Sequence, residues 1–261
     1  MSHLPCPPST SLVAQLRKAG CVFAEEEAAL ITATAHTPRE RARMAERRSS
    51  GTPLEHVLGW ARFHDLRLRV EPGVFVPRPR TEFLATKALA RTRPGALVVD
   101  LCCGTGALGA YLATRQRGVR LHATDIDATS VRCAQHNIAP LGGRAHHGDL
   151  FSPLPATLRG RVDVVVVNAP YVPTEQIALL PTEVRDHEPR RSLDGGLDGL
   201  DVVRRVCAHA RAWLAPRGHL LIQANPGQRT DAMAALTAGG LLATSLTCDD
   251  TDTCVVIGQR R

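Results

Sequence analysis

Aromatic residues, lysine and long apolar runs are scarce in this chain of 261 residues. Phe, Trp and Tyr make up 3% of it, although 44% of its residues are hydrophobic. Apolar runs such as Val164 to Val167 are far shorter than the ~18 residues that a membrane helix needs, so we expect no membrane segment. Prolines near the start occupy positions where a signal peptide needs an apolar helix. We therefore expect a soluble, cytoplasmic protein with a sizeable core.

The cysteines and the charges exclude further classes. The eight cysteines contain no Cys-x-x-Cys pair, which favours reduced thiols over a zinc site or a disulfide framework, and we expect no metal. The adjacent Cys102 and Cys103 are explained better as small residues of a tight turn than as a metal or redox pair. The net charge of +7 comes almost entirely from arginine. A basic surface can bind nucleic acid, but these arginines are scattered, which favours an ordinary solvated surface.

The chain divides into three predicted regions. Residues 1–50 form a small helical domain and contain Thr37-Pro38-Arg39-Glu40, a capping box with proline at the first helical position. Residues 51–94 form a predicted linker that contains a β-hairpin. Residues 95–261 alternate strand and helix patterns and form the main domain.

Two kinds of strand are expected. In the linker, Leu66 to Val70 and Val74 to Val76 flank a Pro-Gly turn and are expected to pair with each other as the hairpin. In the main domain the strands are apolar on both faces, which is typical of a parallel sheet covered by helices on both sides. The seven expected strands are Ala96 to Leu101, Arg120 to Thr124, Ala145 to Gly148, Val162 to Val167, His219 to Gln223, Ala243 to Thr247 and Thr253 to Ile257. This pattern predicts a doubly wound α/β domain.

A glycine-rich turn directly follows the first of these seven strands. Gly104, Gly106 and Gly109 satisfy the G-x-G-x-x-G pattern of dinucleotide-binding proteins and open a helix, whose free N–H groups attract a nucleotide. Asp125 ends the next strand, where its carboxylate can accept hydrogen bonds from two ribose hydroxyls. Asp149 ends the third strand and is expected either to bind an adenine amino group or to cap a loop. The turn and the acid together indicate a nucleotide-like ligand.

Asn168-Ala169-Pro170-Tyr171 follows the most apolar strand. Ligands of open parallel sheets bind at the carboxyl ends of the strands, so Asn168 is expected beside the glycine-rich turn. The Asn168 side-chain oxygen and the Ala169 carbonyl supply two acceptors for the two N–H groups of a planar amide or amino group, and Tyr171 adds a flat face. The alternative is an ordinary turn after a strand.

These motifs together resemble class I S-adenosylmethionine-dependent methyltransferases that act on planar nitrogen. Further motifs make residues 51–261 similar to the protein-glutamine methyltransferases of peptide chain release factors. They are Gly51 to Gly59, Phe63, Arg78 to Glu82, Glu188-Pro189, Leu193 to Leu200 and Gly227-Gln228. The resemblance implies a class I, Rossmann-like fold with a mostly parallel sheet of seven strands, in which the N-terminal helical domain recognises the substrate.

The resemblance also implies a reaction and its residues. The cofactor is S-adenosylmethionine, the product is S-adenosylhomocysteine, and the methyl group goes to the glutamine amide of a Gly-Gly-Gln loop in a release factor. No nucleic acid is required, and a monomer is expected. The implied catalytic residues are Asn168, Ala169, Pro170 and Tyr171; the cofactor-binding residues are Asp100, Cys102, Gly104, Thr105, Gly106, Asp125, Ile126, Asp149, Leu150 and Asn168; the substrate-binding residues are Arg78, Pro79, Glu82, Asn168 and Tyr171.

Three features differ from the usual pattern of that family. Ala169 replaces a proline but keeps the backbone carbonyl, Gln223 replaces a glutamate, and the N-terminal region is shorter. Arg78 and Glu82 are expected either to pair with each other or to anchor the turn between them; the alternative for this stretch is a linker stiffened by prolines.

Three other functions remain as alternatives. A nucleic-acid methyltransferase acting on an exocyclic amino group would use the same Asn-x-Pro-Tyr acceptors, but the sequence contains no basic RNA-binding extension. A dinucleotide oxidoreductase fits the glycines, yet it leaves Asn168 to Tyr171 without a role. A non-catalytic protein that binds the cofactor would explain Ala169 and Gln223 as decay.

Overall fold

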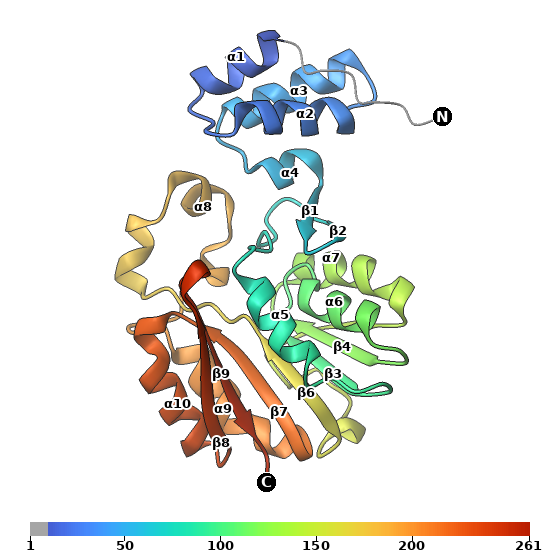
Figure 1. Ribbon diagram of the computed structural model, residues 1–261, viewed down its shortest axis with the longest axis vertical. Helices are drawn as coiled ribbons and strands as arrows, with labels where there is room; N and C mark the ends of the chain where they lie inside the picture. The colour runs from blue at the N-terminus through green and yellow to red at the C-terminus, as the bar shows by residue number, and fades with distance from the viewer. Residues whose placement is uncertain (1–9) are drawn as a thin grey trace.

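The N-terminal helices form a separate layer at one end of the molecule (Figure 1). The computed structural model describes residues 10–261, so Cys6 and the proline-rich start lie outside the described part. The helices are α1 (Thr10–Lys18), α2 (Ala24–Thr34), α3 (Pro38–Ser49) and α4 (Leu54–Leu58). Their apolar faces meet around Leu16, Ile31 and Val57, which form a small core of their own.

The start of α3 confirms half of the predicted capping box. The Thr37 hydroxyl accepts a hydrogen bond from the backbone N–H of Glu40 at 3.1 Å, and Pro38 occupies the first helical position. The Glu40 carboxylate accepts from the N–H of His36 at 2.8 Å, one residue before the expected partner. The Thr37 contact satisfies a backbone N–H that the first helical turn leaves unpaired, whereas the Glu40 contact engages the residue before the cap.

The predicted hairpin partner was wrong. Strand β2 (Leu66–Arg69) pairs in antiparallel fashion with β1 (Trp60–Phe63), and not with Val74 to Val76. His64 has a φ of 51° in the tight turn that joins the two strands. Ala61 and Phe63 are almost fully buried, so β1 contributes an apolar face that the sequence prediction overlooked.

The main sheet confirms the predicted fold class. Its strands are β3 (Leu97–Leu101), β4 (Arg120–Asp125), β5 (Arg144–His147), β6 (Val162–Val167), β7 (Leu214–Ala224), β8 (Leu242–Cys248) and β9 (Thr253–Gln259). They lie in the order β5-β4-β3-β6-β7-β9-β8. The first five are parallel, whereas β9 runs antiparallel to both of its neighbours. All seven predicted strands are present, although β7 begins at Leu214 and not at His219.

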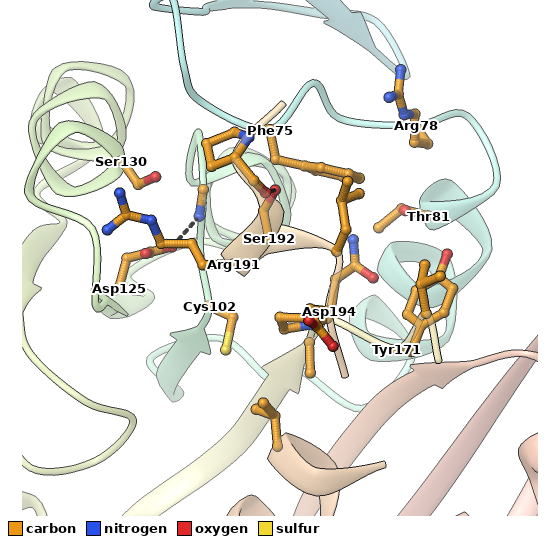
Figure 2. Close-up of a pocket in the computed structure, with 18 of the residues that line it drawn as sticks. Phe75, Arg78, Thr81, Cys102, Asp125, Ser130, Tyr171, Arg191, Ser192 and Asp194 are labelled. Carbon is orange, nitrogen blue, oxygen red and sulfur yellow. Dashed lines mark hydrogen bonds between the residues drawn. The ribbon is translucent and has the colours of Figure 1, made fainter. Parts of the chain in front are cut away.

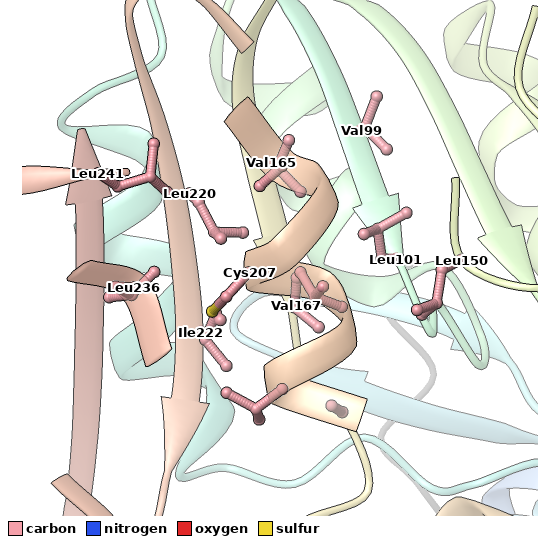
Figure 3. Packing of buried hydrophobic residues seen from close by; sticks show 14 of the residues in the cluster. Val99, Leu101, Leu150, Val165, Val167, Cys207, Leu220, Ile222, Leu236 and Leu241 are labelled. Atoms are coloured by element: carbon pink, nitrogen blue, oxygen red, sulfur yellow. The ribbon is translucent and has the colours of Figure 1, made fainter. Parts of the chain in front are cut away.

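Helices cover both faces of this sheet. On one face lie α5 (Thr81–Leu89), α6 (Ala107–Arg115) and α7 (Ala128–Ile138); on the other lie α9 (Asp201–Trp213) and α10 (Arg229–Ala238). Alternate valines of β6 explain this arrangement, because Val164 and Val166 enter the first core, whereas Val165 and Val167 enter the second. Figure 3 shows Cys207 of α9 packed over Val167 and Ile222 in the second core. The sheet is therefore buried on both sides.

A long connection between β6 and α9 carries α8 (Thr182–His187). Short 3-10 turns occur at Ala139–Leu141, Ala156–Leu158, Thr174–Leu179, Arg190–Ser192, Pro226–Gln228 and Asp249–Thr251. No helix within residues 10–261 is long and apolar enough to cross a membrane. The seven cysteines of the same range are all free.

Candidate active site

A cleft of about 1150 Å³ lies at the carboxyl ends of the parallel strands. It is lined by both predicted motifs, so the fold brings the glycine-rich turn and the Asn-Ala-Pro-Tyr segment together (Figure 2). The predicted site residues that line it are Arg78, Asp100, Cys102, Gly104, Thr105, Asp125, Ile126, Asp149, Leu150, Asn168, Ala169, Pro170 and Tyr171. The other three predicted site residues, Pro79, Glu82 and Gly106, do not line the cleft.

The glycine-rich turn is tied to Asp125 by the backbone. The N–H of Gly104 donates to Asp125 Oδ2 at 2.9 Å, and the N–H of Asp127 donates to Asp125 Oδ1 at 2.9 Å. Burial raises the pKa of the Asp125 carboxyl, while the two backbone donors oppose that shift. Each oxygen keeps further acceptor capacity, so the carboxylate is held in place and can still accept hydrogen bonds from a ligand.

Gly106 has a structural place behind the cleft. It precedes α6 with a φ of 75°, a left-handed conformation that favours glycine. A Cβ atom there would lie 3.1 Å from Ile138 and 3.2 Å from Ala134. Gly106 thus permits α6 to start close to α7.

Asp100 is a buried carboxyl that the nucleotide pattern did not distinguish. It is 1% exposed, and its Oδ2 accepts from the N–H of Gly109 at 2.9 Å. Burial raises its pKa to about 8. Its other oxygen, Oδ1, has no hydrogen-bond partner within residues 10–261. A positively charged or N–H-bearing ligand in the cleft would satisfy this atom, which fits the ammonium and sulfonium groups of S-adenosylmethionine.

Asp149 has a partner that the sequence did not indicate. Its carboxylate forms an ion pair with Arg205 of α9, and both side chains are about half exposed. An exposed pair of this kind contributes little to stability. Asp149 nevertheless lines the cleft, next to Leu150, which is buried and has a φ of 50°.

The Asn-Ala-Pro-Tyr segment is held from a distant part of the chain. Gln228 Nε2 donates to the carbonyl oxygens of Tyr171 and Asp198, each at 2.9 Å. Gly199 packs so closely here that a Cβ atom would lie 2.2 Å from the Tyr171 carbonyl oxygen. The Gly-Gln and Leu193 to Leu200 motifs therefore support this loop, a role that the sequence pattern alone did not reveal.

Asn168 lines the cleft and carries an acceptor without a partner among the described residues. Its Oδ1 is buried and lacks a hydrogen-bond partner in the described part of the chain. The neighbouring Ala169 is 2% exposed and also lines the cleft. The Asn168 side-chain oxygen and the Ala169 backbone carbonyl are two neighbouring acceptors. Together they can hold a group that carries two N–H donors.

Of the two alternatives for Arg78 and Glu82, pairing with each other is not found. Arg78 forms an ion pair of 2.6 Å with Glu188, whose side chain is fully buried and also accepts from the N–H of Val76 at 3.3 Å. Burial raises the pKa of Glu188, although Arg78 opposes this shift. Glu82 instead accepts from the N–H of His64 at 2.6 Å. Each residue therefore anchors its own turn, Arg78 beside the cleft and Glu82 at the hairpin.

The connection between β6 and α9 lines part of the cleft. Arg191 pairs with Asp127 at 3.2 Å, and Figure 2 shows its side chain beside Asp125. In α8 of the same connection, Glu183 Oε2 lies 3.4 Å from Nη1 of Arg48 in α3. These charges link the connection both to the sheet and to the N-terminal helices.

In the part of the chain that the structure describes, no group of three or more His, Cys, Asp or Glu side chains is arranged to hold a metal ion. Burial raises the pKa of the Cys102 and Cys103 thiols, which makes them poor nucleophiles. They act as small residues beside the cleft.

Comparisons with known proteins agree with this geometry. Residues 65–182 match the family model of the methyltransferase small domain. Among solved structures, a 16S rRNA methyltransferase of T. thermophilus has a TM-score of 0.58 at 22% identity and covers 77% of this chain and 50% of its own. A methyltransferase from Pyrococcus furiosus has a TM-score of 0.57 at 16% identity and covers 86% and 99%. At these identities the likeness supports the fold alone.

Curated relatives are more similar. The release factor glutamine methyltransferase of Gloeobacter violaceus is 39% identical over 200 residues, which cover 74% of this chain and 69% of the relative. The enzyme of the same name from Mycolicibacterium smegmatis is 38% identical over 195 residues, with the same coverage. Since the alignments span more than two thirds of these relatives and include both motifs of the cleft, the chain belongs to the release factor glutamine methyltransferase family.

Proposed function

We propose that this protein methylates the side-chain amide nitrogen of a glutamine, in the Gly-Gly-Gln loop of a peptide chain release factor. The observation that carries the proposal is the buried, unsatisfied Oδ1 of Asn168 beside the Ala169 carbonyl, because a primary amide has the two N–H donors that these acceptors need. The relatives named above support the choice of substrate.

The methyl donor is S-adenosylmethionine, whose sulfonium methyl group passes to the acceptor nitrogen and leaves S-adenosylhomocysteine. On this proposal Asp125 binds the ribose, and the turn around Gly104 approaches the amino acid portion. Asp100 faces the positive charge of the cofactor. Ile126, Asp149 and Leu150, which line the cleft, would enclose the adenine ring.

The contribution of Asn168 is to orient a weak nucleophile. An amide nitrogen is a poor nucleophile because its lone pair is delocalised into the carbonyl group. When Asn168 Oδ1 and the Ala169 carbonyl accept its two hydrogens, the lone pair can turn towards the methyl group. The new N–C bond forms as the C–S bond breaks, and the nitrogen then releases one proton to solvent. Positioning in this way supplies most of the acceleration, and no strong base is required.

The remaining features of the proposal concern the surroundings of the enzyme. We expect it to act as a monomer in the cytoplasm, without contact to nucleic acid. The boundaries near residues 50 and 94 divide it into a substrate-recognising helical domain, a linker and the catalytic domain. The family relatives do not favour methylation of nucleic acid or a non-catalytic role.

The test is a methyl-transfer assay with tritium-labelled cofactor. Purified release factor should become labelled, whereas a release factor in which the Gly-Gly-Gln glutamine is replaced by alanine should not. Ribosomal RNA serves as the competing substrate. Labelling of the RNA, or equal labelling of both release factors, would contradict the proposal.

A further inference from the structure

A second buried polar side chain lies beside Asn168. Gln223 is near the carboxyl end of β7. The parallel register pairs Val167, the last residue of β6, with Ile222 of β7, and its continuation by one residue brings Asn168 beside Gln223. Both side chains point to the sheet face that α5 covers, because Val166 and Leu221, two residues earlier in each strand, enter the core on that face. Gln223 is 1% exposed, and its Oε1 lacks a partner among residues 10–261.

The nitrogen of the Gln223 amide contacts Tyr171, which lines the cleft. Gln223 Nε2 donates to the Tyr171 hydroxyl oxygen at 3.4 Å. The phenol accepts in this contact, so its own hydrogen remains available to the cleft that Tyr171 lines. Figure 2 shows Tyr171 and Thr81 on the same side of this cleft. Gln228 holds the backbone of Tyr171, and the contact with Gln223 restrains its hydroxyl.

An amide substrate also has a carbonyl oxygen, which the Asn168 side-chain oxygen and the Ala169 carbonyl do not satisfy because both are acceptors. Those two acceptors take its N–H groups, but its carbonyl oxygen also enters the cleft and needs a donor, since a buried carbonyl without a partner is costly. We propose that Gln223 is a positioning residue that holds the Tyr171 hydroxyl so that it donates to the carbonyl oxygen of the acceptor amide. This inference rests on the proposed function, because it concerns the same amide.

The identity of residue 223 determines what the hydroxyl offers. A neutral glutamine can donate to the phenol oxygen and leave the phenol hydrogen free. An ionised carboxylate has only acceptors and would take the phenol hydrogen for itself. The neutral amide of Gln223 therefore leaves the Tyr171 hydroxyl hydrogen free for a ligand in the cleft.

A double-mutant cycle tests this chain of contacts. The variants are Gln223→Met, Tyr171→Phe and the two combined, each assayed for methylation of the release factor. We expect each single variant to lower kcat/KM for the release factor about tenfold, with cofactor affinity unchanged. The double variant should be no worse than Tyr171→Phe alone, because Gln223 acts through the hydroxyl. Losses that multiply, or an unchanged Tyr171→Phe enzyme, would overturn the inference.

Gln223→Glu provides a variant that preserves shape and does not depend on the folding of Gln223→Met. At alkaline pH, where the introduced carboxyl is ionised, we expect a loss similar to that of Tyr171→Phe. In the Tyr171→Phe background the same substitution should cause no further loss. Full activity of Gln223→Glu under these conditions would overturn the inference, since the phenol hydrogen would then be dispensable.

Failure of this inference differs from failure of the proposed function. If the wild-type enzyme labels the release factor but the cycle shows independent effects, only the role of Gln223 is wrong. If the wild type does not label the release factor, the proposed function falls and this inference falls with it.

Discussion

At the β3 and β4 end of the cleft, polar side chains are held by backbone N–H groups, whereas at the β6 and β7 end they depend on other side chains or lack partners. Asp100 and Asp125 accept from Gly109, Gly104 and Asp127; we call this end the cofactor half. Asn168 and Gln223 each keep an unsatisfied oxygen among the described residues, and with Tyr171 they form the amide half.

The difference indicates how the two ligands are recognised. A carboxylate fixed by backbone donors keeps its geometry without ligand, so the cofactor half is preorganised. Asp100 also keeps one oxygen, Oδ1, without a partner among the described residues, but its other oxygen is already held by a backbone donor. The side-chain oxygen of Asn168 has no such donor, and an unpaired buried acceptor is costly until a donor arrives, so Asn168 becomes satisfied only when substrate fills the amide half. We therefore expect the two halves to fail separately when they are mutated.

The largest effect is expected from Asn168→Ala. Loss of one oriented hydrogen-bonding group in an active site typically lowers the rate by about 10²- to 10³-fold. Cofactor affinity should change little, because the side chain faces the amide. Calorimetry of cofactor binding, combined with single-turnover methylation, checks both expectations. Equal losses of affinity and rate would make Asn168 a cofactor or structural residue, and the separation into halves would be wrong.

Asp125→Ala is the corresponding change in the cofactor half. Losing hydrogen bonds to a charged group costs ~1.5 to 3 kcal/mol, so cofactor affinity should fall roughly tenfold to a hundredfold. The rate at saturating cofactor should fall much less. An unchanged affinity in folded Asp125→Ala would contradict the assignment.

A smaller effect should appear in the pH dependence of stability. Burial raises the pKa of Asp100 from 3.8 to about 8 in the folded protein. Between these values the folded state binds more protons than the unfolded state, so the free energy of unfolding should decrease as the pH rises. Asp100→Asn removes this titration and should flatten the curve.

Urea unfolding from pH 4 to pH 9 measures the effect of Asp100. The cationic cofactor should reduce the slope of the wild type, because it favours the ionised carboxylate. Parallel curves for the wild type and Asp100→Asn would show that Asp100 does not titrate as its burial indicates.

The placement of the glycine-rich turn beside Asp125 could be predicted from the sequence. The glycine-rich turn and Asp125 lie within about twenty residues, and local patterns of strand, turn and helix determine their positions. The amide half depends on residues far apart in the chain. Gln228 holds Tyr171, and Glu188 holds Arg78, across separations of 57 and 110 residues. A polar or charged side chain has many potential partners in a sequence. Only the fold could show that Gln228 contacts Tyr171 and that Glu188 pairs with Arg78.

The smallest effect is expected from Ala169→Pro. The backbone carbonyl of residue 169 is retained, while proline fixes φ near −65° and narrows the conformations of the unfolded loop. A compatible proline typically stabilises by about 0.4 to 1 kcal/mol, so the amide half should become better ordered and the methylation rate should rise about two- to fivefold at most. Cofactor affinity should be measured on the same variant. If the substitution orders only the amide half, this affinity should stay at its wild-type value. A marked loss of rate would mean that the backbone at Ala169 adopts a conformation that proline does not allow, and that the carbonyl of this chain meets its substrate in a different orientation.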